Sequence, residues 1–478
     1  MKEQTRYLIF AAVVLFAVTW TVSMNYGRIR YAGDYILSLS AGITQTILPS
    51  KGVFTTVRPE KLLSYEKPFS VLSDEMFHSG PFLFYKPKNE IKVRDAAAFL
   101  IKYTDIFTIA EMDTMLRKIN SINGNTISEG RIILVPEKLP ALIEDPRNYK
   151  KPEIVFTKGI YLSGSSAGSR RFFEKIPELE SLGINCVVFD IKDVGGIVNH
   201  NSSIADVKRY NTDKNMTIGN VKKLIRELKK NKIYSIARIS VFHDQLLAKT
   251  DKSLAIKSKR TGGTWTPGGR EIWCDPTNKK VQDYNIKLAV ELAELGVNEI
   301  QFDYIRFPTT GDFSDAVFAY DFGKVSREET IANFLKRARK EISLKNTNLS
   351  IDIFGVVAWG KEVDIKSTGQ RISLLAEHCD VISPMLYPSH FNDDFDGRAN
   401  PGDHPYYFIK EGCSKVIAMS GGKVKVRPWL QAFTLRVSNY NAKYIREQIK
   451  GSDDSNAFGY LFWNASNNYD VVYKALEK

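Results

Sequence analysis

The sequence contains few residues of the kinds that build disulfide frameworks and metal clusters. Only four cysteines occur among 478 residues, and no two of them have C-x-x-C spacing. Each lies in or near an apolar run, which favours buried free thiols over disulfides or a zinc site. The six histidines include no H-x-H or H-E-x-x-H pair, which argues against a metal hydrolase, although a mixed His and Asp site stays open. We therefore expect no metal and no other cofactor.

Three other signatures are absent. Residues 164–168 are rich in Gly and Ser but have neither the Lys-Ser/Thr of a P-loop nor G-x-G-x-x-G spacing, so nucleotide binding is not expected. No G-x-S-x-G elbow marks an esterase. The net charge of +13 is spread over helical segments such as 221–232 and 334–345 and forms no basic stripe. This distribution argues against nucleic acid and favours an anionic partner such as a cell envelope.

The N-terminus carries a long uncharged run. Lys2 and Arg6 precede residues 7–27, which are long enough to cross a bilayer core, and neither a small-x-small cleavage site nor a lipobox cysteine follows. Residues 1–30 are therefore predicted to be an uncleaved signal anchor. Basic residues on both flanks leave the orientation ambiguous, and we expect a single-pass protein of the cell membrane with its bulk on the periplasmic or extracellular side.

Between this anchor and the main domain, the pattern changes twice. Residues 31–89 show no strong periodicity and are predicted to be a stalk. In residues 90–137, a β-like 91–93, two helical segments at 95–103 and 109–119, and the Asn-rich turn before 131–136 resemble a LysM-type glycan-binding module, although its opening turn is missing. The alternative is a small structural β-α-α-β spacer. Residues 138–157, with two prolines and several charges, are predicted to be a linker.

From residue 158 onward, apolar β-runs alternate with amphipathic helical segments. This alternation indicates a parallel α/β architecture, and eight repeats in about 320 residues predict a (β/α)8 TIM barrel over 158–478, with a doubly wound sheet as the alternative. The expected strands are 159–163, 186–192, 234–242, 299–307, 349–357, 381–387, 427–433 and 458–463. The expected helices are 170–182, 218–232, 281–295, 327–344, 367–378, 406–419, 440–450 and 470–477.

Polar or aromatic side chains stand near the carboxyl end of seven of these strands, where a TIM barrel carries its active site. Carboxylates beside aromatic faces are what cleavage of a glycosidic bond requires. Two long loops, 244–280 and 390–405, are candidate lids or sugar clamps, and the aspartates of the second show no calcium-loop pattern. The predicted catalytic carboxylates are Asp303, Asp352 and Asp190; the predicted substrate contacts are Arg238, Arg306, Tyr387, Gln431, Trp463, Trp359 and Trp265. Arg238 and Arg306 are also expected to stabilise the Asp303 anion.

Residues 158–163, 185–193 and above all 296–308, which include F-D-Y-I-R-F-P, resemble an uncharacterised bacterial family of TIM-barrel glycoside hydrolases, distantly similar in form to the α-amylase superfamily. The resemblance implies a nucleophilic Asp on the fourth strand, which Asp303 matches. It also implies a Glu acid/base on the fifth, where this chain has Asp352, and Asp190 is the rival acid.

The resulting hypothesis is an envelope-anchored glycoside hydrolase that cleaves a cell-wall or exported polysaccharide, peptidoglycan included, by a two-carboxylate mechanism. The alternative is a catalytically inactive barrel that binds glycans or acts as a scaffold, which the missing Glu keeps open. A polysaccharide deacetylase or lyase is disfavoured by the missing His pair. The sequence predicts no oligomeric state.

Overall fold

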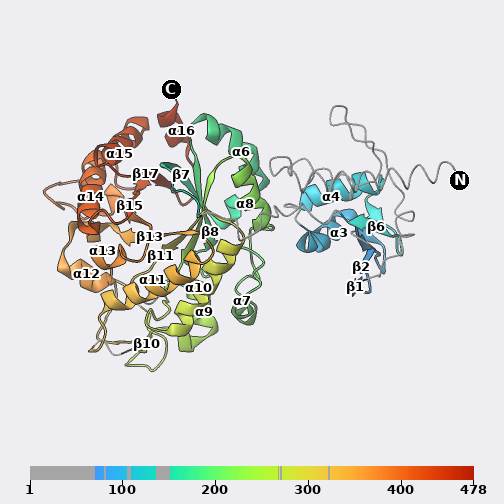
Figure 1. Cartoon of the computed structure of the whole chain (residues 1–478), viewed down its shortest axis with the longest axis horizontal. Coiled ribbons are helices and arrows are strands. Elements are labelled where there is room, and N and C mark those ends of the chain that lie inside the picture. Colours follow the sequence, from blue (N-terminus) through green and yellow to red (C-terminus); the bar gives the residue numbers. More distant parts are fainter. Residues whose placement is uncertain are drawn as a thin grey trace. The chain divides into compact units, whose positions relative to one another are not determined.

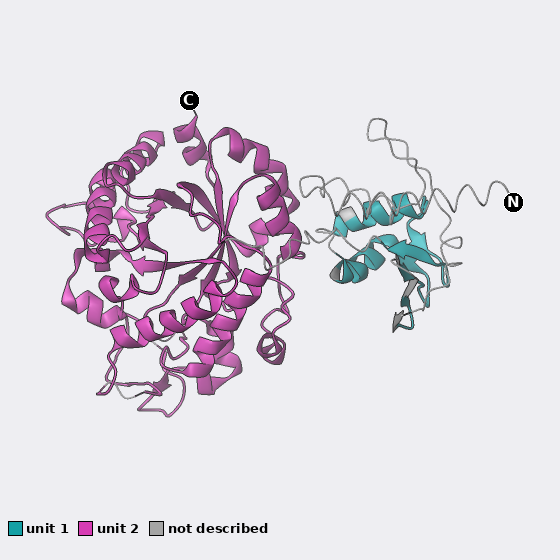
Figure 2. Ribbon diagram, in the orientation of Figure 1, with its two compact units in different colours: residues 1–149 teal, residues 150–478 magenta. Residues whose placement is uncertain are grey.

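The computed structural model describes residues 70–79, 82–104, 109–135 and 151–477, except 267–268, 270–271 and 321–322. The chain divides into two compact units, residues 1–149 and 150–478 (Figure 2). The predicted signal anchor lies outside the described residues, as do most of the predicted stalk and linker. None of the described helices combines the length and apolarity needed to cross a bilayer.

The first unit combines a small antiparallel sheet with two helices. Strands β4 (Ile91–Lys92) and β5 (Thr126–Ile127) pair antiparallel, and helices α3 (Val93–Leu100) and α4 (Ile109–Ile119) lie between them in sequence. This is the β-α-α-β order that both sequence interpretations share. The resemblance to LysM stays a prediction.

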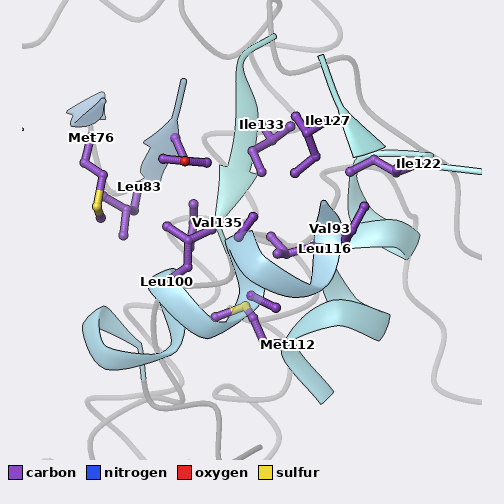
Figure 3. Packing of buried hydrophobic residues seen from close by; sticks show 13 residues of the cluster. Met76, Leu83, Val93, Leu100, Met112, Leu116, Ile122, Ile127, Ile133 and Val135 are labelled. Atoms are coloured by element: carbon purple, nitrogen blue, oxygen red, sulfur yellow. The ribbon is translucent and has the colours of Figure 1, made fainter. Parts of the chain in front are cut away.

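A second sheet in this unit begins in the segment predicted to be a stalk. Strands β1 (Ser70–Ser73), β2 (Met76–Ser79), β3 (Phe82–Tyr85) and β6 (Ile133–Val135) form an antiparallel sheet in that order. Met76 and Leu83 of this sheet pack with Leu100 and Leu116 of the helices in one core (Figure 3). The folded unit therefore starts earlier than residue 90. The sequence did not predict these strands, because four-residue strands are too short to show a clear periodicity.

The second unit is the predicted TIM barrel. Each strand pairs parallel with its neighbours, and the pairings of β13 with β14 and of β17 with β7 close the ring (Figure 1). All eight predicted strands are present. They are β7 (Thr157–Leu162), β8 (Cys186–Lys192), β9 (Tyr234–Ser240), β11 (Glu299–Asp303), β13 (Asn348–Phe354), β14 (Val381–Met385), β16 (Trp429–Gln431), which the short β15 (Lys425–Val426) precedes, and β17 (Gly459–Trp463).

Helices surround this ring (Figure 1). They include α6 (Arg170–Ser181), α8 (Val221–Lys230), α10 (Lys279–Glu294), α11 (Arg327–Ser343), α12 (Glu362–Thr368), α13 (Ile372–Leu375), α14 (Pro405–Ser420), α15 (Ala442–Asp454) and α16 (Asp470–Leu476). The helix predicted over 367–378 is instead the pair α12 and α13. Gly369 ends α12 with a φ of 76°, and a Cβ there would lie 3.0 Å from the carbonyl oxygen of Arg327, so the chain has to turn at this glycine.

The four cysteines are free and buried, as predicted.

Inside the barrel, near the amino-terminal ends of the strands, the fully buried Glu299 pairs with Arg427 and accepts a hydrogen bond of 3.0 Å from the hydroxyl of Tyr234. Arg427 and Tyr234 donate to both oxygens of Glu299, whereas Nε of Arg427 has no hydrogen-bond partner among the described residues. Because both side chains of the pair are fully buried, this layer belongs to the barrel core.

A carboxylate on α10 fastens the loop that follows β8. The Oε2 atom of Glu291 lies 2.9 Å from Nε2 of His200, and Oε1 accepts a hydrogen bond of 2.6 Å from the backbone N–H of Ser203. Burial would raise the pKa of Glu291, but the hydrogen bonds from His200 and Ser203 outweigh it and lower this pKa to about 2. The contacts therefore favour the ionised carboxylate.

This depressed pKa predicts a loss of stability in acid. The contribution is present above the unfolded-state pKa, near 4.5, and disappears as the pH falls towards about 2. After allowance for solvent screening we expect about 2 kcal/mol. In urea unfolding between pH 6 and pH 2.5, Glu291→Gln should lack this loss, whereas the exposed Glu174→Gln should retain it. Equal pH slopes for all three proteins would contradict the assignment.

Candidate active site

Four charged side chains meet inside the barrel at the carboxyl ends of neighbouring strands. They are Asp190 on β8, Arg238 on β9, Asp303 on β11 and Asp352 on β13, and all are buried. Side chains alternate along a strand, so Glu299, Gln301 and Asp303 point to the same side of β11. Glu299 lies in the interior layer near the strand starts, which places Asp303 in the interior layer near the strand ends.

Arg238 is the centre of this cluster. Its Nη1 donates to Oδ1 of Asp190 at 2.5 Å, and its Nη2 and Nε donate to Oδ2 of Asp303 at 2.5 and 3.2 Å. Its Nε also lies 3.9 Å from Oδ2 of Asp352. One guanidinium therefore faces three carboxyl groups, an arrangement in which the three cannot all be anions without cost.

Burial raises the pKa values of the two flanking carboxyls, that of Asp352 more than that of Asp190. For Asp352, burial and the charge of Asp303 raise the pKa well above its usual value, against the opposing influence of Arg238 and of Nε1 of Trp429, which donates to Oδ1 at 2.7 Å. Burial also raises the pKa of Asp190, again against Arg238. Asp303 instead accepts two hydrogen bonds from Arg238 and one of 2.5 Å from the backbone N–H of Tyr304, donors that suit a carboxylate anion.

The geometry brings Asp303 and Asp352 within the range of a carboxylate pair. Nε of Arg238 lies 3.2 Å from Oδ2 of Asp303 and 3.9 Å from Oδ2 of Asp352, so these two Oδ2 atoms can be no more than about 7 Å apart. Pairs about 5 Å apart retain anomeric configuration and pairs about 6.5 to 9.5 Å apart invert it. The separation is compatible with either outcome.

A cavity of about 180 Å³ opens beside this cluster. Asp303 is the one predicted catalytic carboxylate that lines it; Asp190 and Asp352, 3% and 1% exposed, lie behind its wall. The predicted substrate residues Arg238, Arg306, Tyr387 and Trp463 also line it. The other lining residues are Tyr304, Phe354, Gly355, Val356, Met385, His390, Phe391 and Trp429.

Aromatic rings form one side of this cavity. The ring of Trp463 lies 5.7 Å from that of Tyr387 and 5.5 Å from that of Phe433, and His390 lies 5.2 Å from Tyr387. The guanidinium of Arg306 lies 5.0 Å from the rings of Trp273 and Phe354, and its Nη1 donates to the carbonyl of Phe307. Arg238, one of the two arginines predicted to stabilise Asp303, donates two hydrogen bonds to this carboxylate.

Three predicted substrate residues do not line the cavity. Gln431 is buried and joins two loops, because its Nε2 donates to the carbonyl of Phe433 at 2.9 Å and its Oε1 accepts from the N–H of Ser389 at 3.1 Å. Trp359 packs on Phe391 and donates to Asp396 at 2.7 Å. Trp265 is 2% exposed and donates to the carbonyl of Asp312 at 3.0 Å. Each shapes a loop around the site.

Each of the two long loops is held by contacts with another loop. In the loop 244–280, β10 (Lys257–Ser258) pairs with β12 (Ala316–Val317) of the loop that follows β11. In the loop 390–405, Asp393 pairs with Arg436, and Asp403 accepts a hydrogen bond of 2.8 Å from the N–H of Ser438. Across the described ranges, no group of three or more His, Cys, Asp or Glu side chains could hold a metal ion.

The sequence missed two residues of the site and one backbone feature. The hydroxyl of Tyr161 on β7 donates to Oδ2 of Asp190 at 2.6 Å, and His390 lines the cavity. The predicted fourth strand, 299–307, ends at Asp303 because Tyr304 adopts a φ of 51°, a strained value for an aromatic residue. The available signal was that Tyr161 lies near the carboxyl end of the first barrel strand, β7, where a TIM barrel carries its site residues.

An eight-stranded barrel with carboxylates and aromatic rings around a cavity at the carboxyl ends of its strands falls in the class of glycan-active barrels. Residues 159–469 match a family model described as "Putative glycosyl hydrolase domain", and the chain belongs to this family. No curated protein matches the chain.

Similar solved structures include a hypothetical protein from Ruminiclostridium thermocellum ATCC 27405, with 34% identity over 40% of this chain and 96% of that chain and a TM-score of 0.36. The PgaB (BpsB) glycoside hydrolase domain from Bordetella bronchiseptica is 13% identical over 68% of this chain and 99% of its own, with a TM-score of 0.50. The spore cortex-lytic enzyme SleL of Bacillus megaterium QM B1551 is 11% identical over 82% and 85%, with a TM-score of 0.38. At 13% identity, the likeness to the Bordetella domain concerns the fold.

Proposed function

We propose that the barrel hydrolyses O-glycosidic bonds of a cell-wall or exported polysaccharide, with Asp303 and Asp352 as the two carboxylates. The observation that carries this proposal is the pair itself: two carboxyl groups no more than about 7 Å apart, one lining the cavity and one buried beside it, where burial and the charge of Asp303 raise the pKa of Asp352. A carboxyl whose surroundings raise its pKa is typical of the general acid in glycosidases.

In this mechanism Asp303 meets the substrate and Asp352 holds the proton. A carboxylate oxygen of Asp303 attacks the anomeric carbon, or takes a proton from the attacking water, while the bond to the leaving oxygen breaks and that oxygen takes the proton of Asp352. Arg238 and the N–H of Tyr304 hold Asp303 in place. The anomer first released, followed by NMR, decides between retention and inversion.

Trp463 and Tyr387 offer a face on which a sugar ring can stack. We expect Trp463→Ala to raise KM about tenfold, which is about 1.4 kcal/mol, with a smaller change in kcat. Trp359→Ala is the matched control, because Trp359 packs on Phe391 and does not line the cavity; it should lower the thermal stability and leave KM near the wild-type value. The reverse pattern would exclude Trp463 as a sugar platform.

The second candidate function is an inactive barrel that binds glycans or acts as a scaffold. The observation in its favour is that Asp352, where the family resemblance implies Glu, lies behind the cavity wall. A panel of peptidoglycan and exopolysaccharides, assayed for new reducing ends, separates the two. Release of reducing ends supports the hydrolase, and binding without release on every glycan supports the inactive barrel.

The place of action is part of the proposal. The uncharged run 7–27 between basic residues supports a single-pass membrane protein with the barrel on the periplasmic or extracellular side, and the β-α-α-β unit before the barrel supports a LysM-like module that contacts the same glycan. Protease treatment of intact cells and of spheroplasts tests the location. Protection of the barrel in both preparations would place it inside the cell instead.

A further inference from the structure

We propose that Asp190 and Tyr161 are positioning residues, which act through Arg238 on Asp303 and Asp352 and do not contact the substrate. The inference rests on the proposed function of the same site. The contacts form a chain from β7 to β11: the hydroxyl of Tyr161 donates to Asp190, Asp190 accepts from Arg238, and Arg238 donates to Asp303.

Both oxygens of Asp190 are occupied in this chain. Oδ2 accepts the 2.6 Å hydrogen bond from Tyr161, and Oδ1 accepts the 2.5 Å hydrogen bond from Nη1 of Arg238. Asp352 is as buried as Asp190 and does not line the cavity either, but its Oδ2 accepts no hydrogen bond from the described residues. Proton transfer to a glycosidic oxygen requires a carboxyl oxygen that can reach it directly or through a bridging water. Asp352, with one oxygen not engaged, fits the acid role better than Asp190, whose two oxygens are both bound.

The shape of the guanidinium explains why an anchor at this position has an effect. Arginine presents its donors in a rigid planar fork. Nη1 binds Asp190 on one side of the fork, and Nη2 and Nε bind Asp303 on the other. With Asp190 in place, the fork has one orientation, and the carboxylate of Asp303 is held with it. Without the anchor, the fork can rotate and Asp303 loses its fixed position.

Asp190 also changes the charge balance around Asp352, because the two carboxyls share one cation. With an uncharged amide at position 190, fewer carboxylate anions share the positive charge of Arg238. That charge then stabilises the anionic form of Asp352 more strongly, so the pKa of Asp352 falls. The charged and titratable groups around this cluster are Tyr161, Asp193, Asp303, Tyr304, Asp352, Tyr387, Arg427 and Tyr469. Asp190→Asn leaves all of them in place.

The test uses the full chain labelled with ¹³C at the aspartate carboxyl carbons. In Asp190→Asn we expect the NMR titration of Asp352, assigned with Asp352→Asn, to move down by roughly one pH unit. On the polysaccharide that the wild type cleaves, kcat should fall about 100-fold and KM should stay within about twofold. Tyr161→Phe keeps the charge of Asp190, so kcat should fall only about fivefold. The control is Asp380→Asn. Asp380 pairs with Lys151 and Arg339, and its replacement should change neither the titration of Asp352 nor kcat.

The outcomes are separable. A loss of kcat with an unchanged Asp352 titration, or a shifted titration with unchanged kcat, overturns the positioning role. A rise in KM with unchanged kcat overturns it as well, since it would mean contact with substrate. If Asp190→Asn does not fold, Tyr161→Phe decides: wild-type kcat overturns the proposal. If the wild type cleaves no glycan, the proposed hydrolase function fails, and the titration alone decides whether Asp190 acts on Asp352 through Arg238.

Discussion

Asp303→Asn is expected to lower glycan hydrolysis on the order of 10⁴-fold, the kind of loss that follows removal of a group acting directly in the reaction. Of the three buried carboxyls, Asp303 is the one that lines the cavity, so it is the group that a sugar reaches. Asp303 accepts from Arg238 through Oδ2 and from the N–H of Tyr304 through Oδ1, so the single amide oxygen of Asn can replace one of these acceptors while its NH2 group faces the other donor. We therefore expect some loss of thermal stability, and a fall in kcat far larger than any change in KM.

The measurement is the release of reducing ends from the polysaccharide identified in the panel, with circular dichroism and thermal unfolding of the same samples. Asp312→Asn is the matched control: Asp312 is an exposed carboxylate of the loop after β11, bound to Ser314, and its replacement should keep wild-type rates. Full activity in Asp303→Asn would remove Asp303 from the chemistry. Unchanged glycan binding with no turnover in either protein would favour the inactive barrel.

Arg238→Met is expected to cost about 3 to 5 kcal/mol of folding stability at pH 7, because it removes the cation that three buried carboxyls share. Methionine fills much of the same volume, so the loss reports mainly on charge. In this variant the folded-state pKa values of Asp190 and Asp352 lie further above their unfolded values, near 3.9. The destabilisation is therefore absent below that pH and grows as the pH rises.

Urea unfolding at pH 4 and pH 7 measures this dependence. We expect the difference in unfolding free energy between wild type and Arg238→Met to be small at pH 4 and large at pH 7. Arg371→Met is the control, because the half-exposed Arg371 also faces two carboxylates, Glu362 and Glu328, and should cost about 1 kcal/mol or less. Equal losses at both pH values would show that Arg238 stabilises the barrel through packing and not through charge.

The residues deep in the barrel were predictable because a β-strand alternates its side chains. Once the run 299–303 is recognised as the fourth strand, Asp303 must share a side with Glu299 and must lie at the end of that strand. The same periodicity places Arg238 and Asp352 in the interior, where the structure has them within 3.9 Å of one another. Strand order follows from the chain, since each new parallel strand adds beside the previous one.

The outer residues were not predictable in this way. Trp265 and Trp359 lie outside the barrel strands and pack into loop interiors, whereas Trp463, the last residue of β17, lines the cavity. A loop side chain has no periodicity that assigns it to a face. Its direction depends on contacts such as that of Trp359 with Asp396, made by residues far apart in the sequence.

By itself, then, the sequence determined the eight-stranded barrel, the free buried cysteines, and the four strand ends that bring Asp190, Arg238, Asp303 and Asp352 together, because these follow from local periodicity and strand order. The tertiary structure decided which of those carboxyls meets the cavity and which lie behind it. It also decided that Arg238 stands among all three, and that Tyr161 reaches Asp190. Protonation states and access to solvent depend on every neighbour at once, and those neighbours are assembled only when the barrel closes.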